Sequence, residues 1–157
     1  MKKILAIVGS PRKGGNSELL VDEFIKGAQE KGHTVEKVCL REKKIAPCLA
    51  CEACLRNGGT CVQKDDMAAI LDKIIAAAEI TKDDFVLEIG PGIGTMTQYL
   101  AQAAGKVAAV EIDKALIPIL GDTLSSYDNV MIINEDVLKV DIQKLVEEEN
   151  GGRPVKV

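Results

Sequence analysis

Short apolar runs alternate along the chain with longer segments in which apolar residues recur at helical spacing. A strand that is buried on both faces of a parallel sheet is apolar throughout, so each run predicts a strand. The predicted strands cover residues 3–8, 35–40, 85–89, 107–111 and 130–133. Strands that alternate with helical segments in this way are typical of α/β proteins.

The segments between these runs predict helices. Leu20 and Phe24 lie about one helical turn apart, and Gly32 ends that segment. Asp65 and Asp66 offer N-caps to a second helix. The apolar stripe of the second helix consists of Met67, Ile70, Leu71, Ile74 and Ile75.

Three more helices are predicted in the second half of the chain. They fall at about residues 95–104, at residues 116–120 with Pro118 near the start, and at about residues 141–149. Five strands that alternate with five helices predict a three-layer, doubly wound α/β domain with a parallel sheet.

Length and composition narrow the class of protein. At 157 residues the chain has the size of one domain and is too short for two ordinary nucleotide-binding domains. No apolar run approaches the length of a membrane span, and no signal-peptide pattern precedes the first strand, which predicts a soluble, cytoplasmic protein without a membrane partner. The net charge of -4 disfavours nucleic acid as the main partner.

The charge is distributed unevenly along the chain. Residues 1–78 hold 13 Lys and Arg against 10 Asp and Glu, a balance of +3. Residues 79–157 hold 7 against 14, a balance of -7. The composition therefore changes near residue 78, at a predicted helix-to-strand connection.

All five cysteines precede this change. Cys39 falls in a predicted strand and is expected to be a small buried apolar residue. The other four, Cys48, Cys51, Cys54 and Cys61, follow the spacing C-x2-C-x2-C-x6-C. Four thiolates within fourteen residues suit one 4Fe-4S cluster, while zinc and an empty reduced site remain alternatives.

A polar glycine loop joins the first strand to the first helix. Ser10, Arg12, Asn16 and Ser17 offer hydrogen-bond donors there, and the following helix N-terminus favours an anion, although such a turn can also serve only as a connection. With "GSPRKGGNSE", "PCLACEACLRNGGTC" and "KDDM", residues 1–78 resemble the NADPH-dependent FMN reductases, and within them the iron-sulfur flavoproteins. The resemblance implies that the four loop residues bind the FMN phosphate.

Residues 79–157 carry a different pattern. They include "DDFVLEIGPGIGTMTQYLAQAAGKVAAVEID", "LSSYDNVMIINEDVLKVDI" and "GGRPVKV", and they resemble the start of a ribosomal RNA adenine dimethyltransferase. The resemblance implies an S-adenosylmethionine site made of Glu88, Gly90, Gly92, Gly94, Glu111 and Asp136. In it the glycine loop cradles the ligand, Glu111 binds the ribose hydroxyls and Asp136 faces the adenine amino group. A glycine loop followed by an acidic residue would also suit NAD, but the spacing G-x-G-x-G differs from the dinucleotide pattern.

The same family has further parts that this sequence does not match. These are an N-terminal segment over the cofactor, an asparagine-proline-aromatic motif that grips the target adenine, and a helical RNA-binding domain. The sequence stops at Val157, where the next strand of that family would begin. We therefore expect no catalytic residues and no RNA methylation.

Together the two resemblances predict a chimera. In both families successive strands are added outward from the first strand by right-handed crossovers. We therefore expect residues 1–157 to form one domain. In it, fragments 1–78 and 79–157 would share a single flavodoxin-like sheet of order 2-1-3-4-5. We interpret the chain as an engineered, recombinant scaffold that retains half-sites for FMN and S-adenosylmethionine, the latter being the better residual ligand, and that has no turnover.

Two other functions remain open. One is an electron-transfer flavoprotein with FMN and an iron-sulfur cluster, and the other is a module that binds S-adenosylmethionine without methyl transfer. The expected partners are small nucleotide ligands at most, with no nucleic acid, and the expected state is a monomer or a homodimer.

Overall fold

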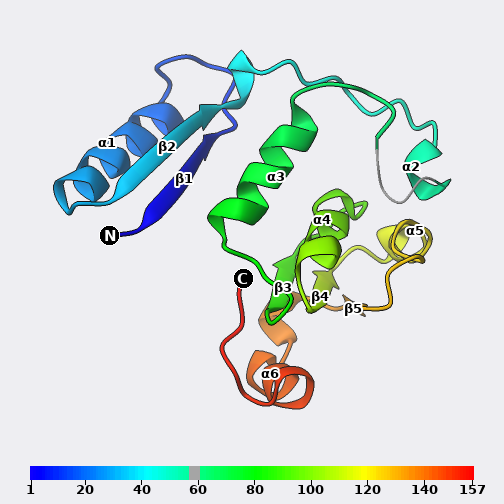
Figure 1. The fold of residues 1–157 in the computed structure, drawn as a ribbon. Helices are drawn as coiled ribbons and strands as arrows, with labels where there is room; N and C mark the ends of the chain where they lie inside the picture. Colours follow the sequence, from blue (N-terminus) through cyan, green and yellow to red (C-terminus); the bar gives the residue numbers. More distant parts are fainter. Residues whose placement is uncertain (57–60) are drawn as a thin grey trace. The chain divides into compact units, whose positions relative to one another are not determined.

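A computed structural model describes residues 1–56 and 61–157 (Figure 1). The chain divides into two compact units, each of which is described by itself. The first unit comprises Met1–Leu49 and Gln63–Ala78, and the second comprises Ala50–Val62 and Glu79–Val157. The boundary at residues 78 and 79 coincides with the change of composition in the sequence. That the whole chain forms one domain stays a prediction.

The first unit is built on two parallel strands, β1 (Lys3–Val8) and β2 (Thr34–Cys39). Their register aligns Lys3 with Thr34 and Val8 with Cys39. Helix α1 (Asn16–Glu30) contacts both strands, and α3 (Met67–Ala77) contacts β1. A short 3-10 helix, η1 (Leu40–Glu42), follows β2.

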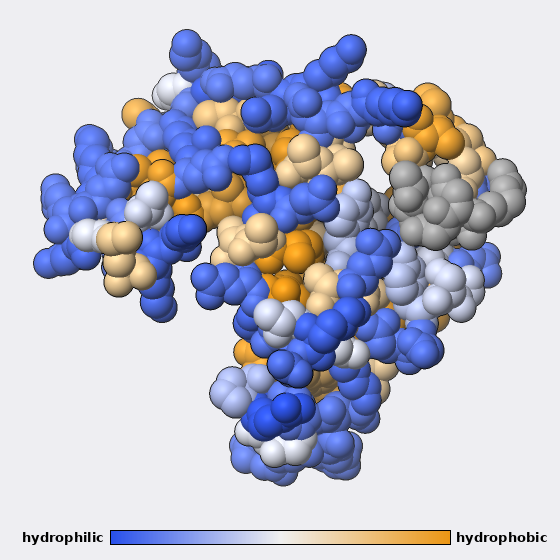
Figure 2. Space-filling view, viewed as in Figure 1, coloured by the Kyte–Doolittle hydropathy of each residue, from blue (hydrophilic) through white to orange (hydrophobic). Residues whose placement is uncertain are grey.

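Much of the apolar surface of α1 is exposed. Leu20 is 72% exposed and Phe24 is 56% exposed, so the apolar stripe that predicted this helix lies outside the core. The buried apolar residues of the first unit instead come from the strands and α3 and include Val8, Val38, Ile70 and Leu71. Apolar patches interrupt the largely hydrophilic surface in Figure 2. The helix itself is confirmed, and Val21, Ile25 and Ala28 on it are partly buried, whereas Leu20 and Phe24 are exposed.

The second unit contains three parallel strands in the order β3-β4-β5. The strands are β3 (Phe85–Ile89), β4 (Lys106–Glu111) and β5 (Val130–Asn134). Its α-helices are α2 (Ala53–Arg56), α4 (Thr95–Ala103), α5 (Ile117–Thr123) and α6 (Ile142–Asn150), and its 3-10 helices are η2 (Lys114–Leu116) and η3 (Val137–Lys139). Pro118 lies in the first turn of α5, where the ring is tolerated.

The core of the second unit lies along β3 and β4. Phe85, Leu87, Ala108 and Val110 are buried together. Partly buried residues that pack against them are Met131, Ile133, Val137, Val140, Leu145, Val146 and Val155. β4 is buried along nearly its whole length, as its continuous apolar sequence predicts.

The predicted five-stranded sheet is not shown by the described strands. The described strands form a two-stranded sheet and a three-stranded sheet, and β1 is not paired with β3. A physical reason lies at the edge of β3 that faces away from β4. There the Leu87 N–H donates to the Lys156 carbonyl at 2.8 Å, and the Lys156 N–H donates to the Phe85 carbonyl at 3.0 Å. The C-terminal segment therefore occupies the edge that β1 would need.

None of the helices in residues 1–56 and 61–157 has the length and apolar character needed to cross a bilayer.

Candidate functional site

A glycine loop joins β3 to α4 in the second unit. Gly90, Gly92 and Gly94 have φ angles of 73°, 61° and 85°, a left-handed conformation that favours glycine. A β-carbon on Gly90 or Gly92 would meet no atom within 4 Å, whereas one on Gly94 would lie 3.1 Å from a methyl group of Leu120. The first two glycines thus leave open space beside the loop, and the third allows α5 to pack closely.

Glu111 ties the end of β4 to this loop. Its side chain is only 5% exposed. One carboxylate oxygen accepts the Gly92 N–H at 3.1 Å, and the other accepts the Asp113 N–H at 2.9 Å. From the end of β5, the Asn134 amide donates to the Glu111 carbonyl at 2.8 Å. The carboxylate is therefore held in place, and each oxygen keeps a lone pair for a further donor.

Glu88 and Thr97 place two buried oxygens close to the same loop. Among the described residues, neither Glu88 Oε2 nor Thr97 Oγ1 has a hydrogen-bond partner of normal geometry. Burial raises the pKa of the Glu88 carboxyl, and the nearby Thr97 hydroxyl opposes part of that rise. Buried polar atoms without partners are uncommon in native proteins and mark places where a ligand group could bind.

Asp136 has a local structural role. It precedes η3, and its Oδ1 accepts the Leu138 N–H at 3.0 Å, so it caps that short helix. The sequence assigned Asp136 to the adenine amino group, and this contact stays a prediction. Glu111 is the last residue of β4, and the glycine loop and Asp136 follow the carboxyl ends of β3 and β5, so all three are at the end of the sheet where α/β proteins bind their ligands.

The predicted phosphate loop lies in the first unit, between β1 and α1. Ser10 is half-buried and accepts the Arg12 N–H at 3.3 Å, while Arg12, Asn16 and Ser17 are exposed. Gly15 occupies the N-cap position and gives α1 no side-chain hydrogen bond. The first amides of this helix are consequently oriented as donors for an anion.

Glu18 is a site residue that the sequence reasoning missed. It is 7% exposed, and its carboxylate accepts from the Gly14 N–H at 2.6 Å, from Arg41 at 2.7 Å and from Lys37 at 3.0 Å. The hydrogen bond from Arg41, followed by those from Gly14 and Lys37, lowers the pKa of Glu18 to about 2. A glutamate in the first turn after a cap is a recognised capping signal, and it could have identified this contact.

The four cysteines with metal-ligand spacing do not form a site in the described residues. Cys48, Cys51 and Cys61 are exposed, and Cys54 is partly buried. Cys48 belongs to the first unit and the other three to the second. Within residues 1–56 and 61–157, no three His, Cys, Asp or Glu residues are close enough to hold a metal ion. The cluster or zinc site stays a prediction from spacing, and part of the segment between Cys54 and Cys61 lies outside the described residues.

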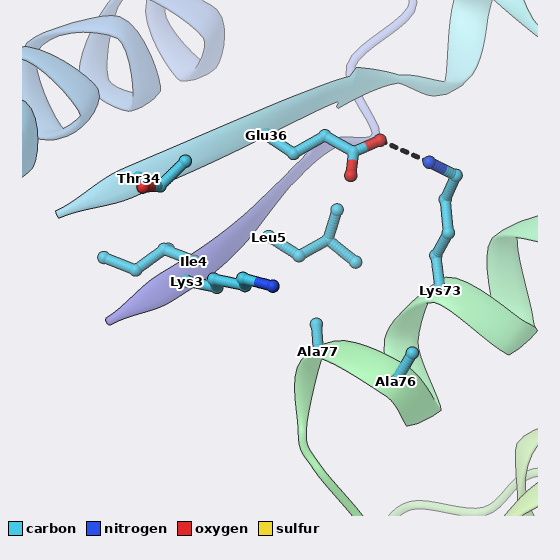
Figure 3. A pocket seen from close by; sticks show the side chains of 8 residues that line it. All are labelled: Lys3, Ile4, Leu5, Thr34, Glu36, Lys73, Ala76 and Ala77. Carbon is cyan, nitrogen blue, oxygen red and sulfur yellow. Dashed lines mark hydrogen bonds and ion pairs between the residues drawn. The ribbon is translucent and has the colours of Figure 1, made fainter. Parts of the chain in front are cut away.

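A recess of about 300 Å³ in the first unit lies between the start of the sheet and the end of α3 (Figure 3). Its lining consists of Lys3, Ile4, Leu5, Thr34, Glu36, Lys73, Ala76 and Ala77. Glu36 and Lys73 form an ion pair with each other. Since this recess is at the amino ends of the strands, it is distinct from the predicted phosphate loop.

Two family models match the chain. The model of NADPH-dependent FMN reductase matches residues 2–80, and the model of ribosomal RNA adenine dimethylase matches residues 67–156. Both resemblances predicted from the sequence are thereby confirmed. The second match begins earlier than residue 79, so both models include α3.

Similar proteins support the second match. Ribosomal RNA small subunit methyltransferase A of Lachnoclostridium phytofermentans is 74% identical over 89 residues, which are 56% of this chain and 31% of that protein. The protein of the same name from Clostridioides difficile is 54% identical over 88 residues, 56% of this chain and 30% of that protein. The chain thus spans about a third of the length of the curated relatives it matches.

Solved structures give related matches. A dimethyladenosine transferase from Plasmodium falciparum is 39% identical with a TM-score of 0.43, covering 46% of this chain and 27% of that one. The 23S rRNA methyltransferase ErmE is 38% identical with a TM-score of 0.44, and the match covers 46% of this chain and 30% of that one. The two family models show that residues 2–80 belong to the NADPH-dependent FMN reductase family and residues 67–156 to the ribosomal RNA adenine dimethylase family, so the chain is a chimera of the two.

Proposed function

We propose that the second unit binds S-adenosylmethionine through its adenosine half and that the chain serves as a scaffold without turnover. The observation that carries this proposal is the Glu111 carboxylate, which is buried at the end of β4 and is bonded to Gly92 of the glycine loop. An acidic side chain held at this place can accept two ribose hydroxyls, because each oxygen has a lone pair to spare.

The surrounding residues support the same ligand. The open space beside Gly90 and Gly92 allows a ligand to approach the loop backbone. Glu88 Oε2 and Thr97 Oγ1 offer buried polar atoms for the remainder of the ligand. Asp136 would accept the adenine amino group through the carboxylate oxygen that does not cap η3.

Calorimetric titration with S-adenosylhomocysteine tests the proposal. Glu111→Gln keeps the side-chain volume but removes the charge, and we expect affinity to fall by about tenfold or more, since a hydrogen bond to a charged group contributes roughly 1.5–3 kcal/mol. Glu148→Gln is the matched control, because Glu148 is exposed on α6. Equal affinities for both variants, or no binding by the unmodified chain, would contradict the proposal.

Absence of turnover is a separate part of the proposal. It is measured by transfer of a labelled methyl group from S-adenosylmethionine to small-subunit ribosomal RNA. We expect the chain to give no more transfer than a reaction without protein. Transfer above that background that is lost in Glu111→Gln would show that the chain is a methyltransferase.

FMN is the second candidate ligand. It is favoured by the uncapped amides at the start of α1, beside Ser10, Arg12, Asn16 and Ser17. Glu18 already takes the Gly14 N–H, so we rank FMN below S-adenosylmethionine. Sub-micromolar FMN binding that is abolished by Asn16→Ala with Ser17→Ala would reverse this order and favour an electron-transfer flavoprotein.

The metal site and the origin of the chimera also stay predictions. After anaerobic reconstitution with iron and sulfide, or with zinc, the unmodified chain should hold more iron or zinc than a Cys48→Ser, Cys51→Ser variant if the cysteines still bind a cluster or a metal.

An engineered origin is consistent with two family matches that overlap only across residues 67–80.

A further inference from the structure

Glu88 and the apolar cluster of the second unit are on opposite faces of β3. Side chains alternate between the two faces of a strand, and Phe85 and Leu87 both belong to that cluster. Glu88, which follows Leu87, therefore points to the other face. Helix α4 contacts β4 and contributes no residue to the cluster, and its Thr97 hydroxyl is near the Glu88 carboxyl. Helix α4 thus covers the face to which Glu88 points.

Thr97 is completely buried on the inner side of α4. Its exposed fraction is 0%, and Leu100 and Ala101, which follow on the same side of the helix, are buried too. A threonine inside a helix often donates to the carbonyl of the residue one turn earlier. Among the described residues, the Thr97 hydroxyl makes neither that bond nor another one of normal geometry. Its proton is therefore available to a neighbouring side chain.

The Glu88 carboxyl is that neighbour. Its Oε2 likewise has no hydrogen-bond partner of normal geometry within residues 1–56 and 61–157. Burial raises the pKa of Glu88, and the Thr97 hydroxyl lowers it in part, as a donor to the charged form does. In the described part of the chain, no charged side chain is among the causes of this shift. The carboxylate thus has a donor beside it but lacks a cation there.

We propose that Thr97 is a positioning residue for the ligand of the second unit: its hydroxyl donates to the Glu88 carboxylate and holds it to accept a ligand ammonium group. This inference rests on the proposed function. In the order β3-β4-β5, adenine would lie at Asp136 after β5 and the ribose at Glu111 on β4. The amino-acid end of the ligand is then directed toward β3, where Glu88 lies. Thr97 acts on the ligand only through Glu88.

NMR titration of the Glu88 side-chain carboxyl tests the first step without any ligand. Thr97→Val removes the hydroxyl and keeps the branched shape, while Thr97→Ser keeps the hydroxyl. We expect the pKa of Glu88 to be higher in Thr97→Val than in the unmodified chain, because only the effect of burial is left. Thr97→Ser should leave the pKa of Glu88 close to that of the unmodified chain. An unchanged pKa in Thr97→Val would overturn the proposal.

Calorimetric titration with two ligands tests the second step. S-adenosylhomocysteine carries the ammonium group, whereas methylthioadenosine has the same nucleoside without the amino-acid end. We expect Thr97→Val to weaken the first ligand about tenfold and to leave the second unchanged, and Thr97→Ser to bind both normally. Partial unfolding would weaken both ligands alike. In a Glu88→Gln background, Thr97→Val should have little further effect, since the two residues act as a unit.

The outcomes distinguish this proposal from the proposed function. Glu111→Gln should weaken both ligands, because both contain the ribose. If Glu111→Gln does so but Thr97→Val weakens both ligands equally, or adds its full effect to that of Glu88→Gln, Thr97 acts through packing and this proposal alone is overturned. If neither ligand binds the unmodified chain, the proposed function and this inference are both overturned.

Discussion

Glu18 and Glu88 are two carboxyl groups whose surroundings shift their pKa values in opposite directions. The Glu18 carboxylate accepts hydrogen bonds from a backbone N–H and from two cationic side chains, and these bonds stabilise its charged form. Glu88 is partly buried, and this burial favours its neutral form and raises its pKa, although the Thr97 hydroxyl opposes part of the rise. The two units should therefore respond to pH with opposite signs at these residues.

For Glu18 we predict a loss of stability in acid. Its pKa is lowered from 4.5 to about 2, so the stabilisation is fully present above pH 4.5 and is lost as the pH falls toward 2. The free energy of unfolding in urea should thus be lower for Glu18→Gln at pH 7, and the difference should shrink between pH 4.5 and pH 2. Glu23→Gln, on the exposed side of the same helix, should show little difference at any pH.

For Glu88 we predict the reverse dependence. Its pKa is raised in the folded state, so its contribution is most favourable below the unfolded pKa near 4.5 and worsens as the pH rises. Glu88→Gln should therefore raise the free energy of unfolding at pH 7 and have little effect at pH 4. A variant that is less stable than the unmodified chain at pH 7 would show that the carboxylate has a partner in solution.

At the scale of single elements, local sequence patterns predicted most boundaries. The strand predicted at residues 85–89 has those bounds, and those predicted at 107–111 and 130–133 differ from β4 and β5 by one residue each. The candidate ligand residues at the ends of β3, β4 and β5 came from the resemblance to the dimethyltransferases, and their contacts with a ligand stay predictions. Thr97 was missed because its burial depends on packing between elements, and so do the contacts of Glu18 with Arg41 and Lys37, whereas the contact of Glu18 with Gly14 is local to the start of α1.

Strand neighbours were harder to predict than the strands. Apolar runs show that a strand is buried, but they carry no information on which edge it will use. Crossover handedness allowed β3 beside β1, yet the backbone of Lys156 forms two hydrogen bonds to β3 at that edge. The backbone of Lys156 thus pairs with an edge of β3 that the strand pattern left unassigned.

The edge contact of Lys156 leads to a prediction at this scale. Lys156→Pro removes the N–H that donates to Phe85, and loss of this bond should destabilise the second unit by about 1–3 kcal/mol. Lys156→Ala keeps the backbone bonds and loses only the contacts of its ammonium with Asp84 and Glu79, so a smaller effect is expected. Hydrogen exchange of the Leu87 amide measures the difference, and equal protection in both variants would contradict it.

At the scale of the whole molecule, the second unit has a buried core made of its own residues. The buried cluster around Phe85, Leu87, Ala108 and Val110 and its packing partners lie within residues 85–155. Helix α2, from the segment at residues 50–62, contacts α5 but contributes no residue to that cluster. The charge balance differs as well, with +3 before residue 79 and -7 from it onward.

We therefore predict that residues 79–157 fold alone. The isolated fragment should give a cooperative thermal transition by circular dichroism and dispersed amide signals by NMR, because its core is complete without residues 1–78. Glu111→Gln in the fragment should leave the transition largely intact if its main role is ligand binding. A fragment without a cooperative transition would favour the single domain expected from the sequence.

The two hydrogen bonds that Lys156 makes to β3 also matter for recombination between α/β proteins. Fragments are commonly matched by strand count and crossover hand, and both agree for these two families. When a segment of a fragment already pairs with the edge strand of that fragment, a strand from the other fragment cannot pair at the same edge, even if strand count and crossover hand agree. Crossover points in such libraries should therefore be chosen by which strand edges each fragment leaves vacant.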